Sequence, residues 1–313
     1  MNDLDLKMSD YFGDKIKYNE PLNDKVSLKV GGVADYYIEA KTVDDISRAI
    51  RFCFENKVPY FVLGGGYNIL PADAGFQGMV IKNNANEAIF SASSSEVIVE
   101  SGISIGRLIN LAAGRDLGGL EFMFGIPGTV GGAIYGNAGA FGHEIGDFVK
   151  SATILVVVED RLETRKVDRS WFHFAYRESS LKKESKRYAA KPIILTVTLQ
   201  LARRRKDEIL SMMKECLDKK KKTQPLDESS AGSFFKNPGQ TKEMSAGYLI
   251  EKVGGKKMKV GGSAVSSKHA NFLVNKNNAS AKDIQDLAAK IKETVAEKYN
   301  VKLEEEIEYI GNW

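Results

Sequence analysis

The sequence predicts a globular protein of the α+β or mixed α/β class, with helices and strands interspersed along the whole chain. Short apolar runs with strand-like character recur throughout, and segments whose apolar residues repeat at helical spacing lie between them. The length of 313 residues suggests two or three domains. An apolar fraction of 43% and a charged fraction of 27% are ordinary for a soluble globular protein, so no fibrous or disordered class is indicated.

Composition excludes several functional classes. The net charge of +4 slightly favours an anionic small molecule and is too weak to indicate nucleic-acid binding. Cys53 and Cys216 lie far apart and the three histidines do not cluster, so we expect neither a disulfide framework nor a metal site. No run approaches about eighteen apolar residues. The N-terminus also lacks a basic region followed by an apolar run, so we expect a cytoplasmic protein that does not enter a membrane.

The first third of the chain predicts a strand–helix–strand unit. Residues 1–20 are polar and indicate an appended arm or helix, and residues 34–40 indicate a strand. Thr42 is a suitable N-cap for a following helix, and Asp45 three residues on comes close to a capping box. Helical spacing predicts a buried face made of Ile46, Ile50 and Phe54.

A second strand, 59–63, runs directly into the glycines of the segment 64–68. In α/β proteins the carboxyl end of a strand, followed by glycines, is where ligand phosphates bind. A flexible turn explains the same glycines equally well, so this segment alone decides nothing.

The middle of the chain continues the alternation. A helix follows its N-cap Ser104, and Gly118–Gly119 closes the turn after it. Residues 203–222 predict a strongly charged helix with a solvated face, ended by Gln224–Pro225. Four further strands are predicted, at 78–82, 96–102, 151–158 and 191–201.

A separate unit begins after Pro225. Residues 231–238 form a turn with aromatic anchors, and Ser280 caps a helix that runs to about Tyr299. The remaining elements are a helix at 246–253 and strands at 271–275 and 303–310.

The most unusual stretch is 125–142, in which seven of eighteen residues are glycine and none is charged. Glycine allows positive φ and close approach of the backbone to another group. Backbone N–H groups in such a stretch can hold an anionic or ring-shaped ligand. A tightly packed turn between strands is the alternative. Neither GxGxxG after a strand nor GxxxxGK[ST] is present, so neither nucleotide fingerprint applies.

Seven motifs, in order, resemble those of the UDP-N-acetylenolpyruvoylglucosamine reductases, flavoenzymes that complete UDP-N-acetylmuramate for the bacterial cell wall. Together they cover nearly all of the chain after residue 20. They are 64–70 with Asp73 and Gly75, 125–133 with 137–140, Tyr176–Ser179, Gln224–Pro225, Gly232–Pro238, Gly261–Gly262 with His269–Phe272, and Leu303–Glu306.

The resemblance implies an α+β chain with a vanillyl-alcohol-oxidase (PCMH-type) FAD-binding fold of two subdomains, 21–84 and 85–210. A C-terminal α+β substrate-binding domain, 211–313, would follow, and its last strand could return to the first subdomain. Only 55 residues separate Arg177 from Ser233, as in the shorter subtype that lacks an inserted tyrosine loop.

The resemblance also implies non-covalent FAD, because no histidine or cysteine lies in a flavin-attachment context. Tyr67 stands where serine is usual, which affects the expected FAD affinity; Tyr135–Gly136 and Glu308 also depart from the family pattern. The implied FAD contacts are Gly64, Gly65, Gly66, Tyr67, Asn68, Gly125, Pro127, Gly128, Thr129, Gly132, Asn137, Ala138 and Gly139.

The implied reaction moves hydride from NADPH to FAD and then to the vinyl carbon of the enolpyruvyl ether. Negative charge develops on the substrate carboxylate, so the site needs a fixed cation and a proton donor. Arg177 suits the first role, since guanidinium is always charged and binds carboxylate in bidentate geometry. Ser233 is the expected donor to C2. Without the family, a surface arginine and a turn serine would be the default interpretations.

Glu306 is the expected catalytic carboxylate. In a strand, Glu304, Glu306 and Glu308 share one face and Leu303, Ile307 and Tyr309 the other. A solvated face explains Glu304 and Glu308. The register among 304–306 is open from the sequence, and we choose Glu306, which we expect to be protonated.

The resemblance gives the UDP-sugar three further contacts. Asn237 and a lysine, Lys236 or one of Lys219–Lys222, would meet the diphosphate, and Tyr176 would stack on or hydrogen-bond the substrate. His143 and His269 are expected to be structural.

Two other functions fit parts of the sequence. One is an FAD-dependent sugar or alcohol oxidase of the same fold, and the other is a non-catalytic nucleotide-sugar sensor. The reductase motifs at 232–238 and 303–306, with Arg177, Ser233 and Glu306 present, favour the reductase. We expect a monomer whose partners are the UDP-sugar and NADPH, with no nucleic acid.

Overall fold

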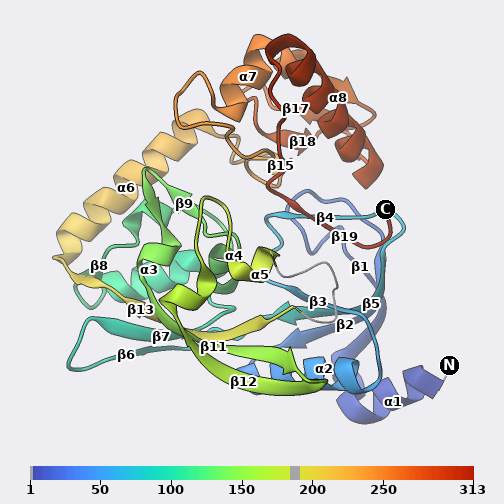
Figure 1. The fold of residues 1–313 in the computed structure, drawn as a ribbon, viewed down its shortest axis with the longest axis vertical. Helices are drawn as coiled ribbons and strands as arrows, with labels where there is room; N and C mark the ends of the chain where they lie inside the picture. Colours follow the sequence, from blue (N-terminus) through green and yellow to red (C-terminus); the bar gives the residue numbers. More distant parts are fainter. Residues whose placement is uncertain (1–2, 184–190) are drawn as a thin grey trace. The chain divides into compact units, whose positions relative to one another are not determined.

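The computed structural model describes residues 3–183 and 191–313, which form two compact units (Figure 1). Unit 1 comprises Met1–Tyr18, Tyr36–Gly65 and Gly78–Asp218, and unit 2 comprises Asn19–Asp35, Gly66–Gln77 and Lys219–Trp313. Helices and strands alternate in both, as predicted. The division into domains at 21–84, 85–210 and 211–313 stays a prediction.

A four-stranded sheet of order β1-β2-β5-β3 belongs largely to unit 1. Its strands are β1 (Ile16–Pro21), β2 (Val33–Ala40), β3 (Tyr60–Leu63) and β5 (Phe76–Asn83), with β3 parallel to β5. Helices α1 (Asp3–Phe12) and α2 (Val43–Glu55) bring buried side chains into the core of this sheet.

The predicted start of α2 is confirmed, because Thr42 Oγ1 accepts the N–H of Asp45 at 3.1 Å. Its predicted buried face is partly wrong. Ile46 and Ile50 are fully buried, whereas Phe54 is only partly buried and Cys53 is fully buried. At 3.6 residues per turn, the residue eight positions after Ile46 (Phe54) lies about 80° around the helix from it, whereas the residue seven positions after it (Cys53) lies only about 20° away.

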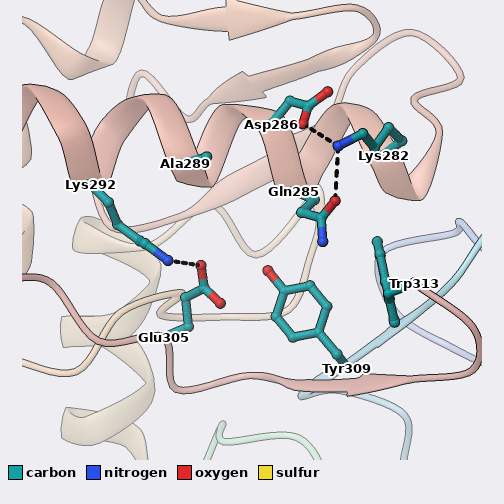
Figure 2. Close-up of a pocket in the computed structure, with 8 residues that line it drawn as sticks. All are labelled: Lys282, Gln285, Asp286, Ala289, Lys292, Glu305, Tyr309 and Trp313. Carbon is teal, nitrogen blue, oxygen red and sulfur yellow. Dashed lines mark hydrogen bonds and ion pairs between the residues drawn. The ribbon is translucent and has the colours of Figure 1, made fainter.

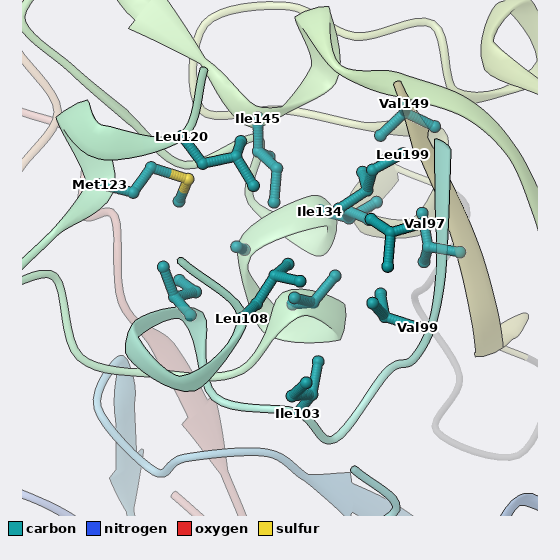
Figure 3. Close-up of a cluster of buried hydrophobic side chains, with 14 of the residues drawn as sticks. Val97, Val99, Ile103, Leu108, Leu120, Met123, Ile134, Ile145, Val149 and Leu199 are labelled. Carbon is teal, nitrogen blue, oxygen red and sulfur yellow. The ribbon is translucent and has the colours of Figure 1, made fainter. Parts of the chain in front are cut away.

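A five-stranded antiparallel sheet of order β12-β11-β13-β7-β6 forms the rest of the unit 1 framework. Helices α3 (Ile105–Ala113) and α4 (Val130–Tyr135) lie on one of its faces and share its core (Figures 1 and 3). Its strands are β6 (Ala88–Phe90), β7 (Glu96–Glu100), β11 (Val149–Val158), β12 (Arg161–Asp168) and β13 (Ile193–Gln200).

Several elements of unit 1 differ from prediction. Strand β12 was not predicted, since this edge strand is polar and largely solvent-exposed. Helix α3 ends at Gly114, and Gly118 lies instead in β8. Other short elements are β8 (Leu117–Gly118) paired with β14 (Ala202–Arg203), β9 (Gly139–Ala140) paired with β10 (His143–Glu144), and α5 (Ser180–Lys183).

The charged helix is confirmed as α6 (Lys206–Thr223), which runs from unit 1 into unit 2. In unit 2, α7 (Ala246–Lys252) and α8 (Ala281–Tyr299) pack their buried residues into one core. A small sheet of order β15-β18-β17-β16 completes it, formed by β15 (Ser229–Ser230), β16 (Lys259–Val260), β17 (Ser263–Val265) and β18 (Leu273–Asn275).

The N-terminus of α8 gives a structural role to Asp73, a residue of the first sequence motif. Ser280 and Asp283 form a complete capping box, as the cap prediction required. The Asp73 carboxylate also accepts the N–H groups of Ala281 and Lys282, at 2.8 and 3.0 Å. Asp73 therefore neutralises unsatisfied donors of the first turn of α8.

The last predicted strand, 303–310, is regular only over β19 (Glu308–Ile310), which pairs in parallel with β4 (Ile69–Pro71). Both strands belong to unit 2. Residues 304–306, before β19, are extended instead and form backbone hydrogen bonds with residues 234–236.

Within residues 3–183 and 191–313, no helix is long and apolar enough to cross a membrane. The same residues contain no group of three or more His, Cys, Asp or Glu side chains that could hold a metal ion. Burial raises the pKa of the Cys53 thiol to about 12, which keeps this cysteine protonated and unreactive.

Candidate active site

The glycine-rich stretch of unit 1 is not a plain loop, because its centre is the short helix α4. Thr129 is the N-cap of this helix, and its Oγ1 accepts the N–H of Gly132 at 3.3 Å. The Gly128 carbonyl accepts the N–H of Ile105 at 3.1 Å, which ties the stretch to the start of α3. Two helix N-termini therefore meet at residues 128–130, and their dipoles favour an anionic group there. The N–H of Val130 is itself paired with the Ile103 carbonyl, at 2.9 Å.

Contacts within the protein, or a positive φ, explain the glycines at positions 64 and 128. A Cβ at Gly64 would lie 2.6 Å from Thr129 Oγ1, and Gly128 has a φ of +128°. Gly132 is different, since it is exposed, and a Cβ there would meet only Thr129 Oγ1, at 3.5 Å. Helical glycine costs roughly 1 kcal/mol relative to alanine. An open backbone kept at this cost fits close approach of a large planar or anionic cofactor such as FAD.

Replacing Gly132 by alanine separates stability from cofactor binding. We expect Gly132→Ala to raise the stability of the FAD-free protein by about 0.4–1 kcal/mol. The same methyl group should weaken FAD binding by about 5- to 150-fold, through about 1–3 kcal/mol of steric conflict. Thermal unfolding of the apoprotein and a fluorescence titration with FAD measure the two effects.

Gly106 provides the matched control, since it lies in α3 and a Cβ there would meet nothing within 4 Å. Gly106→Ala should raise stability and leave FAD affinity unchanged. Equal FAD affinity in Gly132→Ala and the parent protein would show that no ligand approaches Gly132.

Tyr176 and Arg177 form the tip of a tight turn beside this stretch. Ala175 and Glu178 exchange both backbone hydrogen bonds, at 3.1 and 3.0 Å, and Arg177 has a φ of +56°. The Arg177 guanidinium lies 5.3 Å from the Tyr176 ring centroid, and its Nη2 donates to the Gly139 carbonyl at 3.0 Å. Strained backbone at a non-glycine residue is typical of functional sites.

Asn137 is the link between the turn and the glycine-rich stretch. Its side chain is fully buried, and Nδ2 donates to Glu144 Oε2 at 2.6 Å and to the Ala175 carbonyl at 3.0 Å. Its Oδ1 accepts the N–H of Gly146 at 3.1 Å. The side-chain amide of Asn137 is thus engaged within the protein, which favours a supporting role for it and leaves the backbone for any cofactor contact.

In unit 2, the segment that carries Ser233 runs antiparallel to the segment that carries Glu306. Phe235 and Glu305 form the bridge, the Glu306 N–H donates to the Phe234 carbonyl at 2.9 Å, and the Lys236 N–H donates to the Glu304 carbonyl at 2.8 Å. Ser233 and Glu306 therefore lie on neighbouring strands of one ladder.

Asn68 fixes the same carboxylate segment from the other side. Its Nδ2 donates to the Glu306 carbonyl at 3.1 Å, and its own carbonyl accepts the N–H of Glu308 at 2.9 Å. The neighbouring Tyr67 is 44% exposed, which shows that the bulky residue is accommodated by pointing away from the core. Gly66 is required here, because a Cβ would lie 2.2 Å from the Lys25 carbonyl oxygen.

Two of the three consecutive glutamates pair with lysines. Glu304 accepts from Lys236 Nζ at 2.5 Å, and Glu305 accepts from Lys292 Nζ at 3.0 Å. Lys236 is buried, whereas the Glu304 side chain is 71% exposed.

Asn271 is a residue of this site that sequence reasoning did not select. It is buried; its Nδ2 donates to the Phe235 carbonyl at 2.8 Å and its Oδ1 accepts the Phe235 N–H at 3.0 Å. It therefore holds the segment between Ser233 and Lys236 in place. Its position in the motif His269–Phe272 was the available signal.

The contacts of His269 are with neighbouring protein groups, which fits the structural role expected for it. Burial, followed by the charge of Lys256, lowers the pKa of its imidazole. The neutral ring accepts the Asn271 N–H at Nδ1, 3.2 Å away, and packs edge-on against Phe272. His143 is exposed and its ring lies 5.5 Å from that of Phe122.

The predicted site residues fall into two groups. Unit 1 contains Gly64, Gly65, Gly125, Pro127, Gly128, Thr129, Gly132, Asn137, Ala138, Gly139, Tyr176 and Arg177, and unit 2 contains Gly66, Tyr67, Asn68, Ser233, Lys236, Asn237 and Glu306. The structure brings Arg177 to Gly139 and Asn68 to Glu306. The Asn237 side chain accepts the N–H of Ala246, at the start of α7, at 3.1 Å.

A pocket of about 550 Å³ lies in unit 2 between α8 and the C-terminal segment (Figure 2). None of the predicted site residues lines it. The lining residues are Lys282, Gln285, Asp286, Ala289, Lys292, Glu305, Tyr309 and Trp313.

Two sequence families match the chain in separate regions. An FAD binding domain matches residues 34–159, and the C-terminal domain of UDP-N-acetylenolpyruvoylglucosamine reductase matches residues 224–310. The chain is 39% identical over 298 residues to the UDP-N-acetylenolpyruvoylglucosamine reductase of Clostridium novyi, covering 95% of this chain and 93% of the relative. Its identity to the corresponding reductase of Listeria monocytogenes is 37% over 296 residues, with 95% of each covered.

A solved structure has the same fold over nearly the whole chain. The crystal structure of UDP-N-acetylenolpyruvylglucosamine reductase from Thermus caldophilus matches with a TM-score of 0.74 and 32% identity, covering 94% of this chain and 98% of that one. These matches confirm the predicted fold class, an FAD-binding fold followed by a C-terminal domain. The segment between Arg177 and Ser233 includes residues 184–190, which lie outside the described residues, so the absence of an inserted tyrosine loop stays a prediction.

Proposed function

This chain belongs to the UDP-N-acetylenolpyruvoylglucosamine reductase family, and on that premise we propose that it reduces the enolpyruvyl group of UDP-N-acetylenolpyruvoylglucosamine to give UDP-N-acetylmuramate. FAD is the cofactor and NADPH the hydride donor. The structural observation that supports this function best is the hydrogen bond from Arg177 to Gly139. It fixes a permanent cation beside the glycine-rich stretch of the FAD-binding domain, where a reductase of an enolpyruvyl carboxylate needs one.

Most of the proposed FAD contacts are residues of unit 1. The helix dipoles that meet at Gly128–Val130 suit the pyrophosphate, and the open backbone at Gly132 allows close approach. Bound FAD would supply hydride transfer from NADPH to the terminal vinyl carbon of the substrate. The remaining proposed contacts are those with Gly64, Gly65, Gly66, Tyr67, Asn68, Gly125, Pro127, Thr129, Ala138 and Gly139, with Asn137 acting through its support of the stretch.

Three side chains would carry the chemistry on the substrate. Arg177 would bind the carboxylate on which negative charge develops, because its planar fork matches two carboxylate oxygens. Ser233 would deliver the proton to C2. Glu306 would bind and polarise the same developing enol carboxylate.

The UDP-sugar would be held by Lys236, Asn237 and Tyr176. Lys236 is a buried ammonium whose exposed partner, Glu304, can move aside for a diphosphate. Tyr176 is 46% exposed and presents its ring to solvent. We further propose that the protein acts in the cytoplasm as a monomer.

Anaerobic reduction and reoxidation test the function directly. NADPH should bleach the visible flavin bands of the purified holoprotein, and UDP-N-acetylenolpyruvoylglucosamine should restore them without oxygen. Bands that return only with oxygen would favour a sugar or alcohol oxidase instead. Absence of flavin bands after reconstitution with FAD would leave the nucleotide-sugar sensor.

A further inference from the structure

The side chain of Glu305 is held on the α8 side of the C-terminal segment. Lys292, on α8, contacts Glu305 Oε1 at 3.0 Å, and the Glu305 side chain is only 21% exposed. The Tyr309 side chain lines the same pocket, within reach of the negative charge of Glu305. Figure 2 shows Lys292, Glu305 and Tyr309 together at one end of the pocket beneath α8.

Tyr309 is suited to hold a carboxylate permanently. Burial, followed by the negative charge and hydrogen bond of Glu305, raises the pKa of its hydroxyl. The raised pKa keeps the hydroxyl protonated, so that it can donate to the Glu305 carboxylate. Its ring packs edge-on against Trp313, with centroids 4.8 Å apart.

Backbone hydrogen bonds alone do not specify the register of this segment. Glu304, Glu305 and Glu306 are identical side chains in succession, and the ladder to residues 234–236 uses only N–H and C=O groups. A slip of one residue would turn every side chain to the opposite face while presenting a carboxylate at each position again. Side-chain contacts therefore distinguish the three positions, and the burial of the flanking Leu303 and Ile307 acts in the same sense.

Lys292 and Tyr309 make that distinction at the central position. Adjacent side chains of an extended segment point to opposite faces, so holding Glu305 toward α8 directs Glu306 away from it. We propose that Lys292 and Tyr309 are positioning residues that, by binding Glu305, set the register in which Glu306 faces the substrate. This inference rests on the proposed function, because it gives Glu306 its catalytic role.

Removing Lys292 should act through the carboxylate that it leaves behind. A partly buried carboxylate without its cation turns toward solvent, which competes with the native register. Removing the charge of Glu305 as well abolishes that competition. The effects of the two substitutions should therefore compensate, as coupled residues do in a double-mutant cycle.

The experiment measures the two half-reactions of the holoenzyme separately, with anaerobic stopped-flow absorbance of the flavin. In Lys292→Met, we expect substrate to reoxidise the flavin about tenfold more slowly, while reduction by NADPH stays unchanged. Lys292→Met/Glu305→Gln should recover most of the lost rate, and Lys292→Arg should remain close to the parent. Tyr309→Phe should slow the same half-reaction by about tenfold, because a charge-assisted hydrogen bond is lost.

Lys282 provides a matched control on the same helix and the same pocket. Its Nζ pairs with Asp286 at 2.7 Å and with Gln285 at 3.1 Å, and its side chain does not contact the carboxylate segment (Figure 2). Lys282→Met should leave both half-reactions unchanged.

Three results would overturn the inference: parent-like reoxidation in Lys292→Met and Tyr309→Phe, equal slowing of both half-reactions, or no recovery in the double variant. If Lys292→Met does not fold, Lys292→Arg and Tyr309→Phe still decide the matter by the same readout. Failure of the proposed function is distinguishable, since substrate would then not reoxidise the flavin of the parent protein.

Discussion

Glu306→Gln is expected to lose its reaction with UDP-N-acetylenolpyruvoylglucosamine while keeping its reaction with NADPH. Glutamine has nearly the same shape as a protonated glutamic acid, but it has no acidic proton to share with the developing enol carboxylate. General acid–base contributions of this kind are typically worth about 10²–10⁴-fold in rate. Rapid-mixing measurements of each half-reaction should show slow flavin reoxidation by substrate and normal reduction by NADPH.

Glu308→Gln is the matched control for this variant. Glu308 lies two residues further along the segment, and its backbone N–H bonds to the Asn68 carbonyl in the ladder that also holds Glu306. It should reoxidise at nearly the parent rate. Equal losses in both variants would mean that the segment requires negative charge in general and that Glu306 has no specific role. Normal reoxidation in Glu306→Gln would remove it from the mechanism.

Local signals in the sequence predicted most helices well, because a cap and a periodic apolar face are short-range features. Thr42, Ser104 and Ser280 each cap the helix that they were expected to begin. The strand at 303–310 was overestimated, since its regular part depends on pairing with β4, more than 200 residues earlier in the chain. Pairing at that separation leaves no trace in local periodicity.

The candidate site was predictable to a similar degree. Glycine content and motif order indicated which segments we expect to bind FAD, since glycine density is visible in the sequence itself. The role of Asn271 was not predictable from residue type, because it depends on the buried Phe235 backbone that the folded chain brings to it. The register of the three glutamates was equally hidden, because the contact that we propose to set it is made by Lys292, on α8.

The second large prediction concerns Arg177. Because its backbone has a positive φ, we expect that replacing this residue by glycine removes the side chain without destabilising the fold. A non-glycine residue at φ +56° is strained by roughly 1–2 kcal/mol relative to glycine. Arg177→Gly relieves this strain and loses one hydrogen bond to Gly139, which is worth about 1 kcal/mol. We therefore expect the thermal stability of Arg177→Gly to remain close to that of the parent protein.

Its activity should not survive. Without the guanidinium, no fixed cation meets the charge that develops on the substrate carboxylate, and loss of such a group costs about 10²–10³-fold in kcat. Arg177→Lys keeps the charge but not the planar fork, so it should recover only part of this loss. Steady-state kinetics with varied substrate should show a lower kcat together with a higher KM, because Arg177 would bind the carboxylate before and during the reaction. A stable Arg177→Gly protein with parent kinetics would show that the strained turn serves some purpose other than presenting a cation, and the assignment of Arg177 to the reaction would be wrong.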